Sequence, residues 1–240
     1  MSAQNQTPPR PLKVYHAPRA LPLGKFYETP EPLPPGKPGE LIRSEQAYEY
    51  HLSYEASTFR ILYHSLSPQG KDVAVSGVVL VPDGTPPAGG WPVIAWAHDF
   101  VGSARQCAPS LLKNLKEGPL LSMYASLGFA VVASDYAGLG TSSPHAVFDT
   151  QSNALDLIYS IPAARAALPQ LGQKWVVAGY SQGANVALRV AEALSETGDA
   201  NYLGAVGIAG VAEPEDMFVR FAKGAERTKA VFLAQGVKAV

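Results

Sequence analysis

Residues 175–184 read WVVAGYSQGA, and this stretch decides the fold. Its first four residues form a short apolar run that predicts a buried strand. The next five form a G-x-S-x-G turn, and a helix is expected over 185–194. A strand–turn–helix of this kind holds the central serine in a strained backbone conformation and raises its Oγ above the sheet. This context predicts that Ser181 is a nucleophile.

Small residues flank Ser181 on both sides. Gly179 and Gly183 are expected to prevent clashes between the strand and the helix, because glycine has no Cβ. The helix that opens at Ser181 aims the Gln182 N–H at any negative charge that forms on a bound substrate. Gln182 is therefore a candidate for an oxyanion hole. The same residues also fit a Gly-rich structural turn without chemistry.

Strands and helices alternate on either side of this turn. Helices are expected at 119–127 and 150–167, with Pro162 as a kink or a break in the second. This alternation predicts an α/β fold, a mostly parallel sheet with helices on both faces. Functional groups then lie beyond the carboxyl ends of the strands. The strands are expected at 59–66, 73–81, 93–97, 129–134, 175–178 and 202–208.

A second polar turn follows the strand at 93–97. Asp99 occupies a place where a backbone N–H can supply the other donor of an oxyanion hole. Its side chain could donate only if burial kept it protonated. His98 fits a structural histidine that hydrogen-bonds under this loop. A third turn, 134–140, is expected to shape a pocket wall at the same edge.

Together these segments resemble the secretory-lipase branch of the α/β-hydrolase superfamily, the yeast lipase A-like proteins and their bacterial relatives. The resemblance runs from about Phe26 to Val211. It implies an α/β-hydrolase fold with Ser181 as nucleophile and Asp99 with Gln182 as oxyanion hole. It also implies a helical cap after the strand at 202–208 and a secreted or periplasmic location. The matching segments are PGELIRSE (38–45), SGVVLVP (76–82), WPVIAWAH (91–98), CAPS (107–110), GFAVVASDYAGLG (128–140) and WVVAGYSQGA (175–184).

Three regions are expected along the chain. Residues 1–40 hold ten of the 21 prolines and predict an extended arm that wraps the surface beyond about residue 22. Residues 41–211 form the N-terminal part of the hydrolase core. Residues 212–240 fit either two amphipathic helices packed on the sheet or the start of a cap whose aromatic side chains face an apolar substrate.

The chain contains no histidine after Ser181. In the α/β-hydrolase fold the triad follows the order Ser, acid, His, whereas the histidines here all come earlier. We therefore expect the acid and the histidine in a C-terminal portion that was cleaved and stays bound as a second chain, or was not included. An out-of-order His145, with Asp149, is the alternative. The five histidines are His16, His51, His64, His98 and His145.

Composition excludes several classes of function. The net charge is −1, from 19 basic and 20 acidic residues, and no run of one sign predicts a nucleic-acid partner. The single cysteine, Cys107, excludes an intrachain disulfide, and no cluster with ligand spacing predicts a metal or a cofactor. No apolar run approaches the ~20 residues of a membrane span, and the polar Met1–Gln6 shows no signal peptide.

The sequence thus predicts a serine carboxylic ester hydrolase that acts on a lipid or another apolar ester through an acyl-enzyme on Ser181. Acyl transfer or amide hydrolysis on the same fold uses the same intermediate and is the first alternative. A catalytically dead, hydrolase-like binding module is the second.

Overall fold

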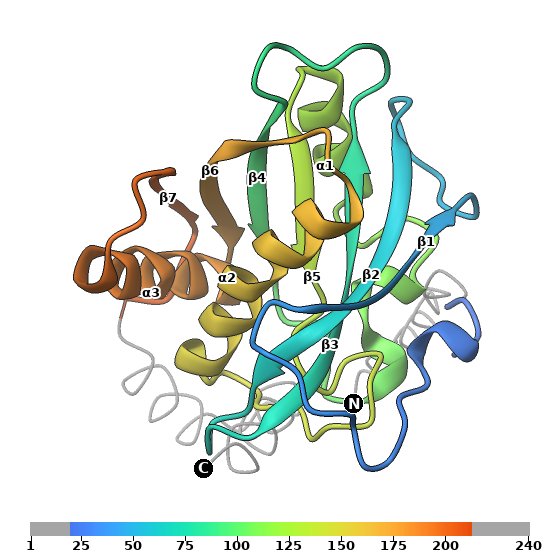
Figure 1. Ribbon diagram of the computed structural model, residues 1–240, viewed down its shortest axis with the longest axis vertical. Helices are drawn as coiled ribbons and strands as arrows, with labels where there is room; N and C mark the ends of the chain where they lie inside the picture. The colour runs from blue at the N-terminus through green and yellow to red at the C-terminus, as the bar shows by residue number, and fades with distance from the viewer. Residues whose placement is uncertain (1–19, 213–240) are drawn as a thin grey trace, which may run out of the picture.

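A computed structural model describes residues 20–212, so that residues 1–19 and the expected cap at 213–240 lie outside the described residues. One seven-stranded sheet carries helices on both faces (Figure 1). The main elements are β1 (Leu41–Ala47), β2 (Ser57–Leu66), β3 (Asp72–Val81), β4 (Trp91–Ala97), α1 (Gly118–Ser126), β5 (Ala130–Ser134), α2 (Thr150–Ala167), β6 (Leu171–Tyr180), α3 (Gln182–Thr197) and β7 (Tyr202–Ile208).

The strands run in the order β1-β2-β3-β5-β4-β6-β7. β1, β2, β3 and β5 pair antiparallel in turn, whereas β5, β4, β6 and β7 are parallel. Ala97, the last residue of β4, is paired with Gly179 near the end of β6. The loops that follow β4, β5 and β6 therefore leave the sheet at one edge, where the sequence places Asp99 and Ser181.

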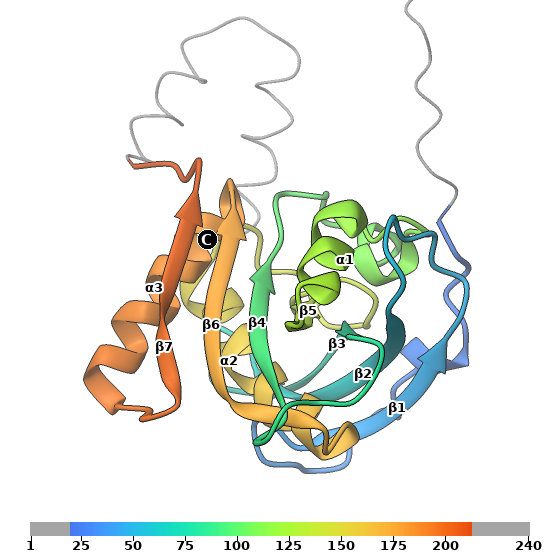
Figure 2. The ribbon, with the colours of Figure 1, turned by 90° about the horizontal axis from the view of Figure 1, so that it is seen from above.

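Helices cover the parallel part of the sheet on both sides. Figure 2 shows α2 and α3 on one face and α1 on the other. Alternate residues of β4 follow this division: Val93 and Ala95 pack in the cluster with α2 and α3, whereas Ile94 and Trp96 pack with α1. This burial on both faces confirms the interpretation of the apolar run at 93–97.

Most predicted elements are present, with ends shifted by a few residues. α2 runs through Pro162 as one helix, which excludes the break that was one of the two alternatives expected there, a kink being the other. β1 was not predicted. It pairs antiparallel with β2, and most of its side chains are exposed or half-buried, so it lacks the clean apolar alternation that marks a strand in a sequence.

The described part of the N-terminal arm lies against the core, as expected. The Leu21 N–H donates to Leu111 O at 2.6 Å. Phe26 and Tyr27 form a short 3-10 helix and are buried. Cys107 is a free thiol that packs against the cluster of buried apolar side chains to which Phe26 and Tyr27 belong. The arm is therefore part of the folded domain from about residue 20.

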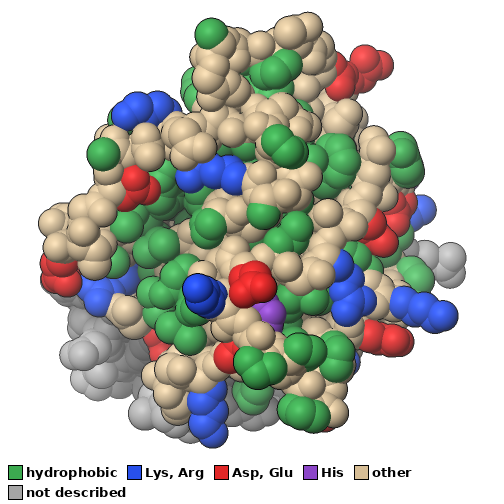
Figure 3. Space-filling model, in the orientation of Figure 1, with side chains coloured by type: hydrophobic (Ala, Val, Ile, Leu, Met, Phe, Trp, Pro, Cys, Tyr) green, Lys and Arg blue, Asp and Glu red, His purple; other side chains and the backbone are tan. Residues whose placement is uncertain are grey.

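Within residues 20–212, no helix has the length and apolar character needed to cross a bilayer. The face seen in Figure 3 carries Lys and Arg side chains interspersed with Asp and Glu among apolar and neutral groups. Among the same residues, no three His, Cys, Asp or Glu side chains come together as a possible metal site.

Candidate active site

Ser181 lies in the predicted strained turn between β6 and α3. Its backbone has φ 54° and ψ −116°, a conformation that non-glycine residues rarely adopt. Such strain costs on the order of 1–3 kcal/mol and persists only where the surroundings enforce it. Its N–H donates to Ile208 O at 2.9 Å, which ties the turn to the end of β7. The side chain stays partly exposed at the carboxyl edge of the sheet.

Gly179 and Gly183 allow this turn to form. A Cβ at Gly179 would lie 2.1 Å from the carbonyl oxygen of Gly183, so the strand and helix meet there as predicted. A Cβ at Gly183 would lie 2.0 Å from Ala97 O and 2.7 Å from His98 O. The absence of a side chain at Gly183 thus brings the serine turn against the loop that leaves β4.

Two backbone N–H groups at this junction have no hydrogen-bond acceptor in the part of the chain that the structure describes. Gln182 is the first residue of α3, and its N–H cannot bond within the helix. Within residues 20–212, neither the Gln182 N–H nor the Asp99 N–H donates a hydrogen bond. Gln182 is itself buried, and its Nε2 also lacks a partner in this part of the chain. The junction therefore offers unused donors close to Ser181.

The Asp99 side chain acts as an acceptor. Its Oδ1 accepts the Phe100 N–H at 2.6 Å, and its Oδ2 lies 3.4 Å from the Lys116 ammonium. Both oxygens of the Asp99 side chain thus face donors and act as acceptors. This geometry favours the backbone N–H of Asp99, rather than its side chain, as an oxyanion donor.

His98 is a structural residue under the same loop. Its Nδ1 lies 2.6 Å from Asp99 O and its Nε2 lies 3.1 Å from Asp135 O. Burial lowers the pKa of His98 to about 4, so the ring is neutral near pH 7 and donates from one nitrogen only. The ring also packs on Tyr136, with 4.2 Å between centroids. This agrees with the structural role predicted for His98.

Asp135 lies in the turn at 134–140, and its buried carboxyl group links separate segments of the chain. It is 1% exposed, and burial raises its pKa. Its Oδ1 accepts the Ser110 N–H at 2.9 Å, and its Oδ2 accepts the Ser76 hydroxyl at 2.6 Å. Sequence analysis did not predict these hydrogen bonds, because Asp135 and the two serines lie on separate elements. The only signal was that Ser110 and Asp135 both fall in the segments that carry the family resemblance.

Two more of the described histidines have hydrogen-bond partners away from Ser181. His64 Nδ1 lies 2.9 Å from Asp72 Oδ1, and His145 Nδ1 lies 2.8 Å from Ala137 O. The Asp149 carboxylate accepts the Ser152 N–H at 3.0 Å and so caps α2. The structure thus gives no support to a His145–Asp149 pair. No hydrogen bond among residues 20–212 joins a histidine to Ser181.

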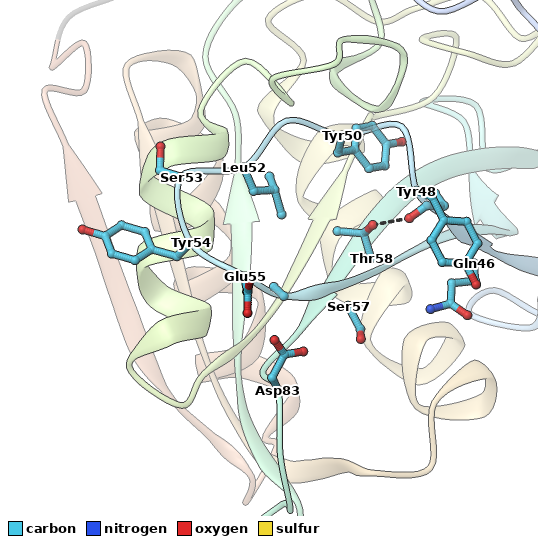
Figure 4. Close-up of a pocket in the computed structure, with 12 residues that line it drawn as sticks. Gln46, Tyr48, Tyr50, Leu52, Ser53, Tyr54, Glu55, Ser57, Thr58 and Asp83 are labelled. Carbon is cyan, nitrogen blue, oxygen red and sulfur yellow. Dashed lines mark hydrogen bonds between the residues drawn. The ribbon is translucent and has the colours of Figure 1, made fainter.

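A surface pocket lies elsewhere on the molecule (Figure 4). It is lined by residues 46–48, 50 and 52–58 together with Asp83. Ser57 of β2 pairs with Val81 of β3. The residue of β3 just before Val81 pairs with Val131, which lies at the start of β5. The pocket is therefore near the amino end of β5, whereas Ser181 follows the carboxyl end of β6.

Neither a protein-family model nor a curated protein sequence matches this chain. Solved structures do match. The rice cell wall degrading esterase LipA from Xanthomonas oryzae superimposes with a TM-score of 0.67 at 24% identity, over 80% of this chain and 55% of that one. Candida antarctica lipase A in its closed state gives a TM-score of 0.74 at 20% identity, over 92% of this chain and 54% of that one.

The chain thus spans little more than half the length of each of these two proteins. At this level of identity the likeness concerns the fold. The chain has the α/β-hydrolase fold, and the solved structures that it resembles include an esterase and a lipase.

Proposed function

We propose that this chain carries the nucleophile and the oxyanion hole of a serine carboxylic ester hydrolase. The observation that carries the proposal is the strained Ser181, with φ 54°, beside the N–H groups of Gln182 and Asp99, which donate to no acceptor within residues 20–212. Strain at a partly exposed serine, next to unused donors, is typical of a site that binds a developing negative charge.

In the proposed reaction, Ser181 Oγ attacks the ester carbonyl carbon as a base removes its proton. The carbonyl oxygen becomes negative and accepts hydrogen bonds from the N–H groups of Asp99 and Gln182. The C–O bond to the alcohol then breaks, and the alcohol leaves with the proton from the base. Water attacks the acyl-enzyme in the same way, releases the carboxylic acid and restores the serine.

In our proposal, the base that accepts the proton is not one of residues 1–240. No histidine follows Ser181, and no described histidine hydrogen-bonds it. A histidine and an acid in a C-terminal portion, either continuous with this chain or bound as a second one, would complete the triad. The mass of the active material tests this: activity in a species of 25.4 kDa alone contradicts it.

The proposed substrate is a lipid or another apolar ester. Phe100 follows Asp99 directly, and its ring stacks on Phe148 with 5.4 Å between centroids. Phe148 belongs to the loop before α2. Two aromatic rings beside the proposed oxyanion hole suit an apolar acyl or alcohol group. The two structural neighbours, an esterase and a lipase, agree with this class of substrate. A secreted or periplasmic location belongs to the same proposal.

Hydrolysis of p-nitrophenyl esters of increasing acyl length tests the proposal. We expect the complete protein to hydrolyse them and Ser181→Ala to lose at least about 10³-fold in kcat, because the acyl-enzyme cannot form. Ser195→Ala on the same helix removes an exposed hydroxyl that bonds only Glu192 O within the described residues, and should keep full activity. Equal activity in the Ser181 variant and the parent rejects the proposal.

A further inference from the structure

Two consecutive residues before α1 have left-handed backbone conformations, although neither is glycine. Leu115 has φ 49° and Lys116 has φ 61°. Leu115 is 2% exposed and packs in the cluster under α1, which holds the turn in place. Strained residues of this kind gather at functional sites, where the surrounding structure fixes the direction of a side chain.

The Lys116 side chain reaches the loop that follows β4. Its ammonium lies 3.4 Å from Asp99 Oδ2 and 3.3 Å from Phe100 O. Asp99 Oδ1 in turn accepts the Phe100 N–H. The Lys116 ammonium therefore contacts both residues of the Asp99–Phe100 turn, and it pairs with the Asp99 carboxylate that accepts the Phe100 N–H.

The charge of Asp99 matters because of what its backbone does in the proposed reaction. The same residue carries an anionic side chain and the N–H that receives the oxyanion. An unneutralised carboxylate beside a developing negative charge would oppose the transition state, more strongly where water is partly excluded. The Asp99 and Lys116 side chains are only 25% and 32% exposed.

A neighbouring acid indicates how weakly this region solvates charge. Burial raises the pKa of Glu117 to about 7, and the nearby Asp99 charge contributes in the same direction. Lys116 acts in the opposite direction on that carboxyl group. Lys116 is thus the cation that balances two acids at this end of the loop.

We propose that Lys116 is a positioning residue of the active site, whose ammonium neutralises the Asp99 carboxylate and fixes the Asp99–Phe100 turn so that the Asp99 N–H faces the oxyanion. The inference rests on the proposed esterase function. It gives Lys116 no contact with the substrate.

Steady-state ester hydrolysis by the complete protein tests the inference. We expect Lys116→Met to lower kcat by roughly 10- to 100-fold with little change in KM, because a small misplacement of an oxyanion donor acts mainly on the transition state. Lys116→Arg should keep most of the activity, since it restores the charge. Lys113→Met is the matched control: this exposed lysine has no side-chain hydrogen bond or ion pair within residues 20–212, and its loss should leave kcat unchanged.

A second substitution separates charge from general structural support. In the Lys116→Met background, Asp99→Asn removes the unbalanced charge but keeps an oxygen for the Phe100 N–H, so part of the lost kcat should return. The thermal midpoint of each variant should stay close to that of the parent, since partly exposed ion pairs contribute little stability.

Two results would overturn the inference alone: an active parent whose Lys116→Met variant keeps its kcat, or a Lys116→Met defect that Asp99→Asn fails to relieve. A parent protein that hydrolyses no ester would instead overturn the proposed function, and this inference with it.

Discussion

At the scale of single residues, the candidate site depends on close backbone approach. Ser181 holds a strained conformation between β6 and α3, and Gly183 lets the first turn of α3 touch the end of β4. These two features bring the Gln182 N–H and the Asp99 N–H to one junction. Both features are properties of the backbone. The approach of α3 to the end of β4 therefore depends on the absence of a side chain at Gly183.

Gly183→Ala tests this dependence. The added Cβ would lie 2.0 Å from Ala97 O, and a carbonyl fixed in a buried strand cannot yield easily. We expect the free energy of unfolding to fall by about 3 kcal/mol, measured by urea denaturation.

Gly24→Ala is the matched control for that measurement. No heavy atom lies within 4 Å of a Cβ at this position and its φ is −88°, so the change should stay within about 0.5 kcal/mol. Equal stability of the Gly183→Ala and parent proteins would show that the junction is looser than the structure indicates.

The residue-level features differ in how far the sequence reveals them. The roles of Gly179 and Gly183 follow from a five-residue motif, because the clash they avoid is local to one turn. The Lys116–Asp99 and Ser110–Asp135 contacts join residues 17 and 25 positions apart on different loops. No periodicity or spacing encodes such contacts, so only the fold reveals them.

At the scale of elements, buried polar groups hold α2 to the sheet. Asp156 of α2 lies fully buried, accepts the Ser65 hydroxyl with Oδ1 and accepts the Ala137 N–H with Oδ2 at 2.8 Å. Tyr63 of β2 donates to the backbone O of Asp156 at 2.8 Å. Burial raises the pKa of Asp156 to about 7.

This shift predicts a pH-dependent stability. Between the ordinary aspartate pKa and about 7, the folded protein keeps a proton that the unfolded chain has released. Through Asp156, stability should therefore fall as the pH rises from about 4 to about 7, by an amount on the order of 4 kcal/mol. Asp156→Asn, which is neutral throughout, should make the fall measured by urea unfolding across the window smaller, and the contribution of Glu117, whose pKa is also raised to about 7, should remain.

Asp83→Asn is the control, because it removes an exposed carboxylate from a loop. It should keep the pH slope of the parent. If Asp156→Asn keeps the same slope, Asp156 is not the group that titrates.

The elements themselves were predictable where burial is two-sided. The run at 93–97 coincides closely with β4, because a strand buried on both faces in the parallel part of a sheet reads as an apolar stretch. β1 escaped prediction because it pairs at the edge of the sheet and exposes much of its surface. The kink or break expected at Pro162 left two alternatives open, and the continuous α2 excludes the break.

At the scale of the whole molecule, the described residues hold one side of the proposed active site. β7 pairs only with β6 in this part of the chain, and its Leu203, Val206 and Ile208 are exposed. The expected cap falls outside the described residues, and the triad acid and histidine remain a proposal. The serine turn was predictable from the sequence because it is contiguous. The way in which the proposed site is completed was not predictable, because no histidine follows Ser181 and contacts between distant segments leave no local pattern.

Covalent labelling of Ser181 by a fluorophosphonate probe tests the central claim most directly, because only an activated serine reacts. The complete protein, purified with any chain that accompanies it, should gain one probe mass, and peptide mapping should place the adduct on Ser181. The Ser181→Ala variant should remain unlabelled. A folded, complete protein that takes up no probe, or takes it up at another serine, would contradict the assignment of Ser181 as the nucleophile.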